Sequence, residues 1–418
     1  MPSVRSVTAR EVLDALAVPT VEVDVVLDDG SRGRASVAGG ISRGPFAVEL
    51  RDGGDRFAGL GVTRAVRGVR ETIGPALHGH DVTDQRAVDR LLCDLDATPD
   101  KSRLGANATL AVSAAVARAA AASTGAPLYR RLAGDGTPTL PVPQMNVLSG
   151  RGPGAVTDVR EFMLVPHGAS SFRQALTWCA ETHRALRSLS RARGWATAVD
   201  DEGALAPPVE GNDAAFALLA EAIEAAGLRP GTDVAVGIDV GPGRRADGTY
   251  RFDGAVRDTE GMIGLYAGWL ARHPLVSVED PLDAADRAGW TQLTAALGDR
   301  LQLTGDSLFA GQAERLRRGI ADGAANAVLL KPGQLGTLTE TLDTMALARE
   351  SGYRCTVSHR TGETDDPLIA ELAAATGCGQ LKSGAPVRGE RVAKYNELLR
   401  IEEDLGAAAR YGERTEAR

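Results

Sequence analysis

The sequence predicts an α/β fold in which a β/α barrel of eight strands follows a smaller N-terminal α+β domain. Downstream of position 230, six apolar runs each end in a charged or polar residue and lead into a turn and an amphipathic helix. The runs end 40, 27, 25, 28 and 23 residues apart, which is the length of one strand plus one helix. Two further strands upstream complete a barrel. The six runs end at Asp239, Glu279, Asp306, Lys331, His359 with Arg360, and Lys382.

Composition narrows the class of protein. With 418 residues the chain is long enough for two domains, and 43% hydrophobic with 24% charged residues is typical of a globular protein. The net charge of −8 without a basic block argues against nucleic acid as a partner. No apolar run is long enough to cross a bilayer, and the first ten residues lack the apolar core of a signal peptide. The four cysteines have no CxxC spacing, as expected in a reducing compartment. We therefore expect a cytoplasmic protein with neither membrane nor nucleic acid as a partner.

Residues 1–137 are expected to form an N-terminal α+β capping domain. Residues 19–27 alternate apolar and acidic side chains, as in a half-buried strand, and residues 28–30 (D-D-G) have the composition of a hairpin turn. The glycine-rich stretch 37–44 is small and long enough to be a mobile flap. From 63 to 125 the apolar residues recur with a helical period.

Residues 138–418 are expected to form the barrel domain. Its first two strands are predicted at 142–148 and 159–165. The segment 198–208 is too rich in Asp, Gly and Pro for a strand. We interpret it as a loop that carries Glu202 over the carboxyl end of the barrel.

Lys331 stands out because only four of the 47 basic residues are lysines. An apolar run at 327–330 leads into Lys331, and Pro332-Gly333 ends the run, which predicts a buried strand with one ammonium group at the edge of the sheet. Arginine stays charged at any working pH, whereas a desolvated lysine near cations can become a neutral base. The alternative is a lysine that extends its ammonium group to solvent.

Three carboxylates, Asp239, Glu279 and Asp306, would lie together because functional side chains of a barrel gather at the carboxyl ends of its strands. Carboxylate ligation suits Mg²⁺, which keeps its remaining positions for water and substrate. Zinc is disfavoured because neither cysteines nor histidines are clustered. The alternative, in which each acid only caps the following helix, is weakened by three such acids in succession.

These residues indicate a reaction. Mg²⁺ near Lys331 and Lys382 would lower the pKa of both amines by like-charge repulsion and would stabilise an enolate. Glu202, Glu161 and His359 are candidates to protonate a departing hydroxyl group. Together they predict the elimination of water from a carboxylate that is bound to Mg²⁺.

At this point the motifs resemble the enolase (phosphopyruvate hydratase) family along the whole chain. The resemblance implies an enolase-type (β/α)8 barrel of order ββαα(βα)6, an N-terminal α+β capping domain, and a homodimer or higher homo-oligomer. A lysine base beside one or two Mg²⁺ ions is the known pattern of that superfamily. The motifs include K-S-R-L-G-A-N-A at 101–108, V-S-V-E-D at 276–280, L-L-K-P-G-Q-L-G-T at 329–337, S-H-R-T-G-E-T at 358–364 and R-V-A-K-Y-N-E at 391–397.

The resemblance also implies a role for each matching residue. The metal positions are Asp239, Glu279 and Asp306 for a first Mg²⁺ and Ser42 of the flap for a second, substrate-dependent ion. The catalytic positions are Lys331 as general base, Glu202 as general acid, Glu161 as the assisting acid, Lys382 beside the substrate carboxylate, and His359. The substrate-binding run is His359, Arg360 and Thr361.

The side of the site that would bind phosphate departs from the family. The segment in which the family carries a histidine reads S-G-R-G-P-G at 149–154, and the glutamine before the assisting acid is Arg160. Arg160 and Arg43 would add positive charge to this side as substrate-binding residues.

Three readings of the substrate stay open. The first is a carbon–oxygen lyase that converts 2-phosphoglycerate into phosphoenolpyruvate, as in glycolysis. The second resembles the carboxyphosphonoenolpyruvate synthases of phosphonate natural-product biosynthesis, whose substrate analogue carries an additional carboxylate. The third is a catalytically impaired scaffold with a binding role.

Overall fold

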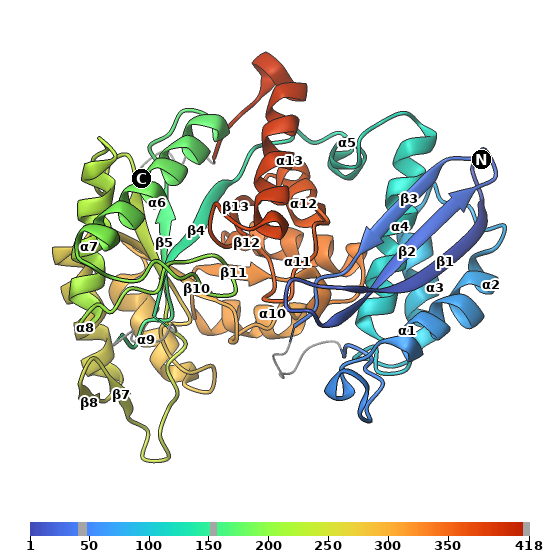
Figure 1. The fold of residues 1–418 in the computed structure, drawn as a ribbon. Helices are drawn as coiled ribbons and strands as arrows, with labels where there is room; N and C mark the ends of the chain where they lie inside the picture. Colours follow the sequence, from blue (N-terminus) through green and yellow to red (C-terminus); the bar gives the residue numbers. More distant parts are fainter. Residues whose placement is uncertain (41–47, 151–156, 413–418) are drawn as a thin grey trace.

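The computed structural model describes residues 1–40, 48–150 and 157–412. A three-stranded cap lies beside a barrel that is surrounded by helices (Figure 1). Each part has its own hydrophobic core, and the core of the cap also includes Leu338, Leu368 and Leu372 of the barrel part. The division between residues 137 and 138 stays a prediction.

The cap sheet consists of β1 (Val4–Leu13), β2 (Pro19–Leu27) and β3 (Arg32–Ser36), in antiparallel order β1-β2-β3. The alternation at 19–27 gives β2 a buried face with Val21, Val23 and Val25, as expected for period-two patterning. The predicted turn joins β2 to β3, with the Ser31 carbonyl accepting a hydrogen bond from the Leu27 amide.

Helix α4 (Ala106–Ser123) covers the cap sheet at very short range. A Cβ atom on Gly33 of β3 would lie 2.0 Å from the Ala115 carbonyl oxygen and 2.3 Å from the Ala119 nitrogen. The alanines of α4 and this glycine therefore bring helix and sheet together at backbone distance. The other cap helices are α1 (Thr63–Gly68), η2 (Val69–Ile73), α2 (Gly74–Leu77), α3 (Gln85–Asp96) and α5 (Leu128–Ala133), with a short turn η1 (Arg56–Gly59).

Eight strands close into a barrel, which confirms the predicted fold class. Strand β5 pairs antiparallel with both of its neighbours, and all other pairs are parallel. The second strand starts at Glu161 and not at 159, since the Val159 carbonyl accepts a hydrogen bond from the Thr157 hydroxyl. The strands are β4 (Val142–Ser149), β5 (Glu161–Val165), β6 (Ala235–Asp239), β9 (Leu275–Glu279), β10 (Gln302–Gly305), β11 (Ala327–Leu330), β12 (Arg354–Ser358) and β13 (Gly379–Lys382).

Strand register aligns the predicted site residues. Asp239 pairs with Glu161 on one side and with Glu279 on the other. Because β5 runs against the other strands, its first residue, Glu161, lies at the carboxyl end of the barrel.

Below this end, the interior of the barrel contains a hydrogen-bonded polar layer. The Gln380 Oε1 atom accepts hydrogen bonds from Gln144 Nε2 at 2.9 Å, Gln302 Nε2 at 2.7 Å and Thr356 Oγ1 at 2.8 Å. Bulky branched residues usually fill this space in such barrels. The layer joins β4, β10, β12 and β13.

Helices surround the barrel (Figure 1). No helix in the part of the chain that the structure describes is both long and apolar enough to span a membrane. A hairpin of β7 (Tyr250–Phe252) and β8 (Ala255–Arg257) was not predicted, although its turn is the dipeptide Asp253-Gly254, a strong hairpin signal. The helices are α6 (Phe172–Ala192), α7 (Asn212–Ala225), α8 (Thr259–Arg272), α9 (Arg287–Leu297), α10 (Ala313–Asp322), α11 (Leu338–Glu350), α12 (Leu368–Thr376) and α13 (Gly389–Leu405), with short turns η3 (Pro332–Gln334) and η4 (Gly406–Ala408).

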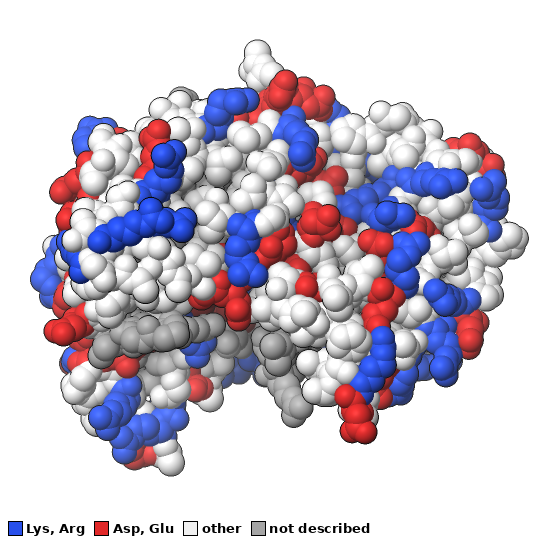
Figure 2. Space-filling model, viewed as in Figure 1, with Lys and Arg blue, Asp and Glu red and all other residues white. Residues whose placement is uncertain are grey.

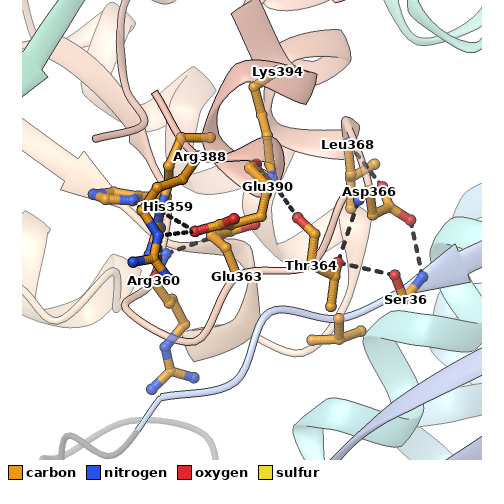
Figure 3. Close-up of polar contacts among 12 residues, drawn as sticks. Ser36, His359, Arg360, Glu363, Thr364, Asp366, Leu368, Arg388, Glu390 and Lys394 are labelled. Atoms are coloured by element: carbon orange, nitrogen blue, oxygen red, sulfur yellow. Dashed lines mark hydrogen bonds and ion pairs between the residues drawn. The ribbon is translucent and has the colours of Figure 1, made fainter. Parts of the chain in front are cut away.

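An ion cluster around Arg118 fixes the cap to the barrel part. The Arg118 guanidinium donates two hydrogen bonds to Asp366, each of 2.7 Å, and one of 2.7 Å to Glu371 Oε2. Asp366 also accepts the backbone amide of Ser36, and the Ser36 and Thr364 hydroxyls are 2.9 Å apart (Figure 3). Cap residues from α4 and β3 thus bind the loop that precedes α12.

Candidate active site

Lys382, the last residue of β13, lies among three carboxylates at the carboxyl end of the barrel. Its Nζ atom is 2.7 Å from Glu279 Oε2, 3.0 Å from Glu161 Oε2 and 3.3 Å from Asp239 Oδ2. All four side chains are buried. Burial alone would lower the pKa of Lys382, but the carboxylates outweigh it and hold this pKa well above its usual value. The structure therefore brings these four predicted residues into one cluster.

Lys331, which follows β11, contacts the remaining predicted carboxylate. Its Nζ atom is 2.6 Å from Asp306 Oδ2. Burial lowers the pKa of Lys331, yet the charges of Asp306 and Glu279 outweigh this effect and raise the pKa above its usual value. In this arrangement the amine is a charged ammonium group. The neutral base expected from the sequence requires a second cation to compete for Asp306.

Acidic groups outnumber the lysines in this cluster. Behind it, Asp280 accepts hydrogen bonds from the backbone amides of Asp306, at 3.0 Å, and Ser307, at 2.9 Å. Burial and the nearby charge of Asp306 raise the pKa of Asp280 to about 7. Burial likewise raises the pKa of Glu279 well above its usual value. The site therefore holds more carboxyl groups than ammonium groups, and their crowding favours the protonated form of the most buried carboxyls.

A divalent cation at this cluster would need several of its carboxylates as ligands. Within the described residues, no group of three or more Asp, Glu, His or Cys side chains is arranged to hold a metal ion. Lys382 Nζ instead lies within hydrogen-bond distance of both Asp239 and Glu279. The chemistry still fits Mg²⁺, because the donors are carboxyl oxygens and these groups outnumber the lysines. In addition, Asp306 Oδ1 is buried with no hydrogen-bond partner among the described residues.

Glu202 lies on the predicted loop, which is anchored to β4. The Leu205 amide donates to the Val147 carbonyl, and the Ser149 amide donates to the Leu205 carbonyl. The Asp200 carboxylate accepts the Glu202 amide at 2.9 Å, which closes the turn. Burial and the charge of Glu161 raise the pKa of Glu202 to about 7. A carboxyl group with this pKa can hold a proton near neutrality and release it.

His359 lies beside Glu202 and is fully buried. Its Nε2 atom is 3.5 Å from Glu202 Oε2, and its Nδ1 atom is 2.6 Å from Arg391 Nη1. Burial and the surrounding cations, Arg391 first among them, hold the pKa of His359 well below its usual value. The imidazole is therefore neutral, which makes Glu202 the better proton donor of the two.

The predicted substrate-binding residues Arg360 and Thr361 follow His359. The Arg360 guanidinium forms an ion pair with Glu49 of the cap, and the Arg360 backbone amide donates to Glu363 at 3.0 Å (Figure 3). The Thr361 carbonyl accepts a hydrogen bond from Arg391 Nη2 at 2.7 Å. Arg360 thus lies where cap and barrel meet, with its charge already paired.

Arg160, the residue before β5, differs from Arg360 in its partners. Its Nη2 atom donates to the Gly241 carbonyl at 2.6 Å, just past the end of β6. No carboxylate of the described residues lies within ion-pair distance of this guanidinium. Arg160 therefore adds net positive charge beside the acidic cluster. The other predicted residues of this side, Ser42 and Arg43, lie outside the described residues.

Several residues of the site were not predicted from the sequence. Arg391 and Asp280 both lie inside motifs that resemble the family. The motifs could therefore have drawn attention to these two residues, but they do not reveal which residues the two side chains contact. Glu49 carried no signal beyond an acidic residue after the glycine-rich stretch. Its pairing with Arg360 depends on cap docking, which spacing along the chain does not reveal.

The antiparallel first strand pair, with lysines and carboxylates at the carboxyl end, defines an α/β-barrel protein with a charged candidate site. Residues 4–132 match the family model described as "Enolase, N-terminal domain". Residues 137–418 match the model described as "Enolase, C-terminal TIM barrel domain". The chain therefore belongs to the enolase family, which supports a lyase in general terms.

Proposed function

We propose that this enolase-family chain is a hydro-lyase that removes the α-proton of 2-phosphoglycerate or a close analogue and then eliminates water. The observation that carries the proposal is the gathering of the partly buried Lys331 and the buried Lys382 among four carboxylates at the carboxyl end of the barrel. Buried charge clusters with strongly shifted pKa values are typical of catalytic sites. Membership of the enolase family supports the same reaction class.

Lys331 is the proposed base. Its neutral Nζ atom takes the α-proton, and the electron pair of the broken C–H bond passes into the substrate. The contact with Asp306 favours the ammonium form, so the resting chain holds Lys331 in the wrong protonation state for this step.

Asp239, Glu279 and Asp306 are the proposed Mg²⁺ ligands, with Ser42 for a second ion. When bound, Mg²⁺ supplies positive charge that stabilises the anion formed from the substrate carboxylate. Asp306 would then divide its charge between two cations, which lowers the pKa of Lys331 towards the base form. Lys382 contributes a second fixed positive charge near the substrate carboxylate.

Glu202 is the proposed acid. It gives its proton to the departing hydroxyl group as the C–O bond breaks, so that water leaves and Glu202 becomes a carboxylate. Its loop contacts β4, three strands away from β11 in the barrel order, so acid and base approach the substrate from different directions. The neutral His359 faces Glu202 with its Nε2 atom at 3.5 Å, and burial together with the charge of Glu161 maintains the raised pKa of Glu202.

A second candidate substrate is a phosphonate or otherwise substituted analogue of 2-phosphoglycerate. Arg160 favours it, because its guanidinium has no carboxylate partner among the described residues. An added carboxylate on the substrate would complement that charge, as in a carboxyphosphonoenolpyruvate synthase-like reaction.

The absorbance of the phosphoenolpyruvate product tests the proposal directly. With 2-phosphoglycerate and Mg²⁺, turnover within about tenfold of the enzyme median of ~10 s⁻¹ supports the first substrate. Exchange of the α-proton with solvent, without product, supports the analogue. The absence of both, with 2-phosphoglycerate and with its carboxylated phosphonate analogue, in a folded chain that binds Mg²⁺, contradicts the proposal and supports a binding scaffold.

The variant Lys331→Ala tests the role of the base. We expect α-proton exchange to fall by at least ~10²-fold, the lower end of the contribution of a positioned base. Arg317→Ala on α10 is the control, because it removes an exposed cation whose ion pair, with Glu314, lies within its own helix and not in the cluster. Exchange that persists in Lys331→Ala at the wild-type rate would assign the base elsewhere.

A further inference from the structure

Arg391, the third residue of α13, is buried between two loops that carry proposed site residues. Its Nη2 atom donates to the Asp201 carbonyl at 3.2 Å, next to Glu202. The same guanidinium donates to the Arg360 carbonyl at 2.9 Å and to the Thr361 carbonyl at 2.7 Å. One side chain therefore binds the loop of the proposed acid to the loop that follows His359.

The contact between Arg391 and His359 fixes the position of a proton. A guanidinium group has only donors, so His359 Nδ1, at 2.6 Å from Arg391 Nη1, must accept the hydrogen bond. A neutral imidazole that accepts at Nδ1 carries its proton on Nε2. That Nε2 atom is the one that lies 3.5 Å from Glu202 Oε2.

The charges around Arg391 favour the same arrangement. Its nearest carboxylate, Glu390, lies 3.5 Å from Nε and also binds Arg388 at 2.8 Å. The positive charge of Arg391 is thus balanced mainly by carbonyl groups, and a second positive charge on the adjacent imidazole would be repelled. On the other side of the loop, Glu363 pairs with the buried Lys394 at 2.5 Å and holds the Arg360 amide (Figure 3).

We propose that Arg391 is a positioning residue that holds His359 as the neutral Nε2–H tautomer and thereby directs a hydrogen-bond donor at Glu202. The inference rests on the proposed function, in which Glu202 gives a proton to the departing hydroxyl group. Arg391 touches neither the acidic cluster nor Lys331 among the contacts of the described residues, so its loss affects the elimination step and leaves α-proton removal in place.

The tautomer can be measured without substrate. We would label the six histidines with ¹⁵N and assign His359 by the variant His359→Gln. In the wild-type chain at neutral pH, His359 should show a protonated Nε2 and an unprotonated Nδ1. In Arg391→Gln this tautomer should be lost or should exchange with others, whereas Arg400→Gln, an exposed arginine of the same helix, should leave it unchanged. A wild-type His359 that is protonated at Nδ1, or is charged, would overturn the inference without any variant.

A kinetic comparison separates positioning from general damage to the fold. In Arg391→Lys and Arg391→Gln we expect the elimination rate to fall by about 10²-fold, the lower end for a disturbed acid catalyst, while α-proton exchange stays close to the wild-type rate. Guanidinium ion added to Arg391→Ala should restore part of the elimination rate. An equal loss of both rates, with no rescue, would overturn the positioning role. Absence of exchange in the wild-type chain would instead refute the proposed function. The tautomer measurement needs no substrate, so it would still test the contact between Arg391 and His359.

Discussion

Replacing Arg118 with methionine is the sharpest test of how the cap is held on the barrel. The substitution keeps the apolar part of the side chain and removes a guanidinium that makes three hydrogen bonds of 2.7 Å to Asp366 and Glu371. The two carboxylate side chains are only 7% and 10% exposed, so both would be left buried without a cation. Removing one partner from a buried ion pair costs about 3–5 kcal/mol.

The cost should depend on pH in a direction that the structure sets. In the wild-type chain, burial raises the pKa of Glu371 above its usual value, whereas Arg118 outweighs burial at Asp366 and lowers its pKa. Without Arg118, burial would raise both pKa values above those of the unfolded chain. The variant would then keep most stability at low pH, where both groups are protonated, and lose it as the pH rises. The deficit relative to wild type should therefore be larger at pH 8 than at pH 5.

Native-state hydrogen exchange of amides in β1, β2 and β3 measures opening of the cap without requiring a two-state transition of the whole chain. The triple variant Arg118→Met, Asp366→Asn, Glu371→Gln is the matched control, because it removes the unpaired charges and should recover much of the loss. Arg90→Met, in an exposed pair with Asp84, should cost at most ~1 kcal/mol. A loss below ~1 kcal/mol in Arg118→Met at pH 8, or no recovery in the triple variant, would refute the reasoning.

Three further predictions concern the site and the cap. Glu202→Gln should lower the elimination rate by about 10²–10⁴-fold while α-proton exchange continues. In the wild-type chain, elimination should fall as the pH rises above about 7, where Glu202 loses its proton. Product absorbance and exchange of the α-proton measure the two steps, and a parallel loss of both would contradict the assignment. Lys382→Met leaves three buried carboxylates without their ammonium group. The midpoint of thermal unfolding should therefore drop in the presence of a chelator and recover in millimolar MgCl₂. A midpoint that does not respond to Mg²⁺ would argue against a cation at this cluster. Gly33→Ala places a Cβ atom 2.0 Å from a carbonyl oxygen of α4 and should destabilise the cap by about 1–3 kcal/mol or more, as measured by urea unfolding. Gly30→Ala, with open space at Cβ but a φ of 88°, tests backbone strain alone. Equal losses of stability in the two variants would mean that close packing at Gly33 adds nothing.

The barrel was predictable because its signal is local and repeated. An apolar run that ends in a polar residue is visible in the sequence, and the spacing of the runs leaves room for one helix each. The carboxyl-end rule then places Asp239, Glu279 and Lys382 together. Glu161 is a different case, since it begins its strand. Its residue type made it a candidate acid, but only the resemblance to a family gave it the role of the assisting acid, because a short apolar run does not reveal the direction of its strand.

The protonation states at the site could not be predicted from residue types. Lys331 and Lys382 were expected to have lowered pKa values beside Mg²⁺, and without a cation the nearby carboxylates raise them. His359 was a candidate acid, and burial together with the charge of Arg391 lowers its pKa and keeps it neutral. Both outcomes depend on which charged atom lies nearest, and this follows from packing between distant segments.

The amide of Gln380 has a consequence for the candidate site at the carboxyl end of the barrel. Its Oε1 atom accepts hydrogen bonds from β4, β10 and β12, so one atom of β13 links four strands of the barrel. Gln380 precedes Lys382 by two residues, hence on the same side of β13. The position of the Lys382 ammonium group along the barrel axis therefore depends on Gln380, a residue that has no proposed role in the reaction. Moving that charge by design would therefore require changes in the polar layer inside the barrel as well as at Lys382 itself.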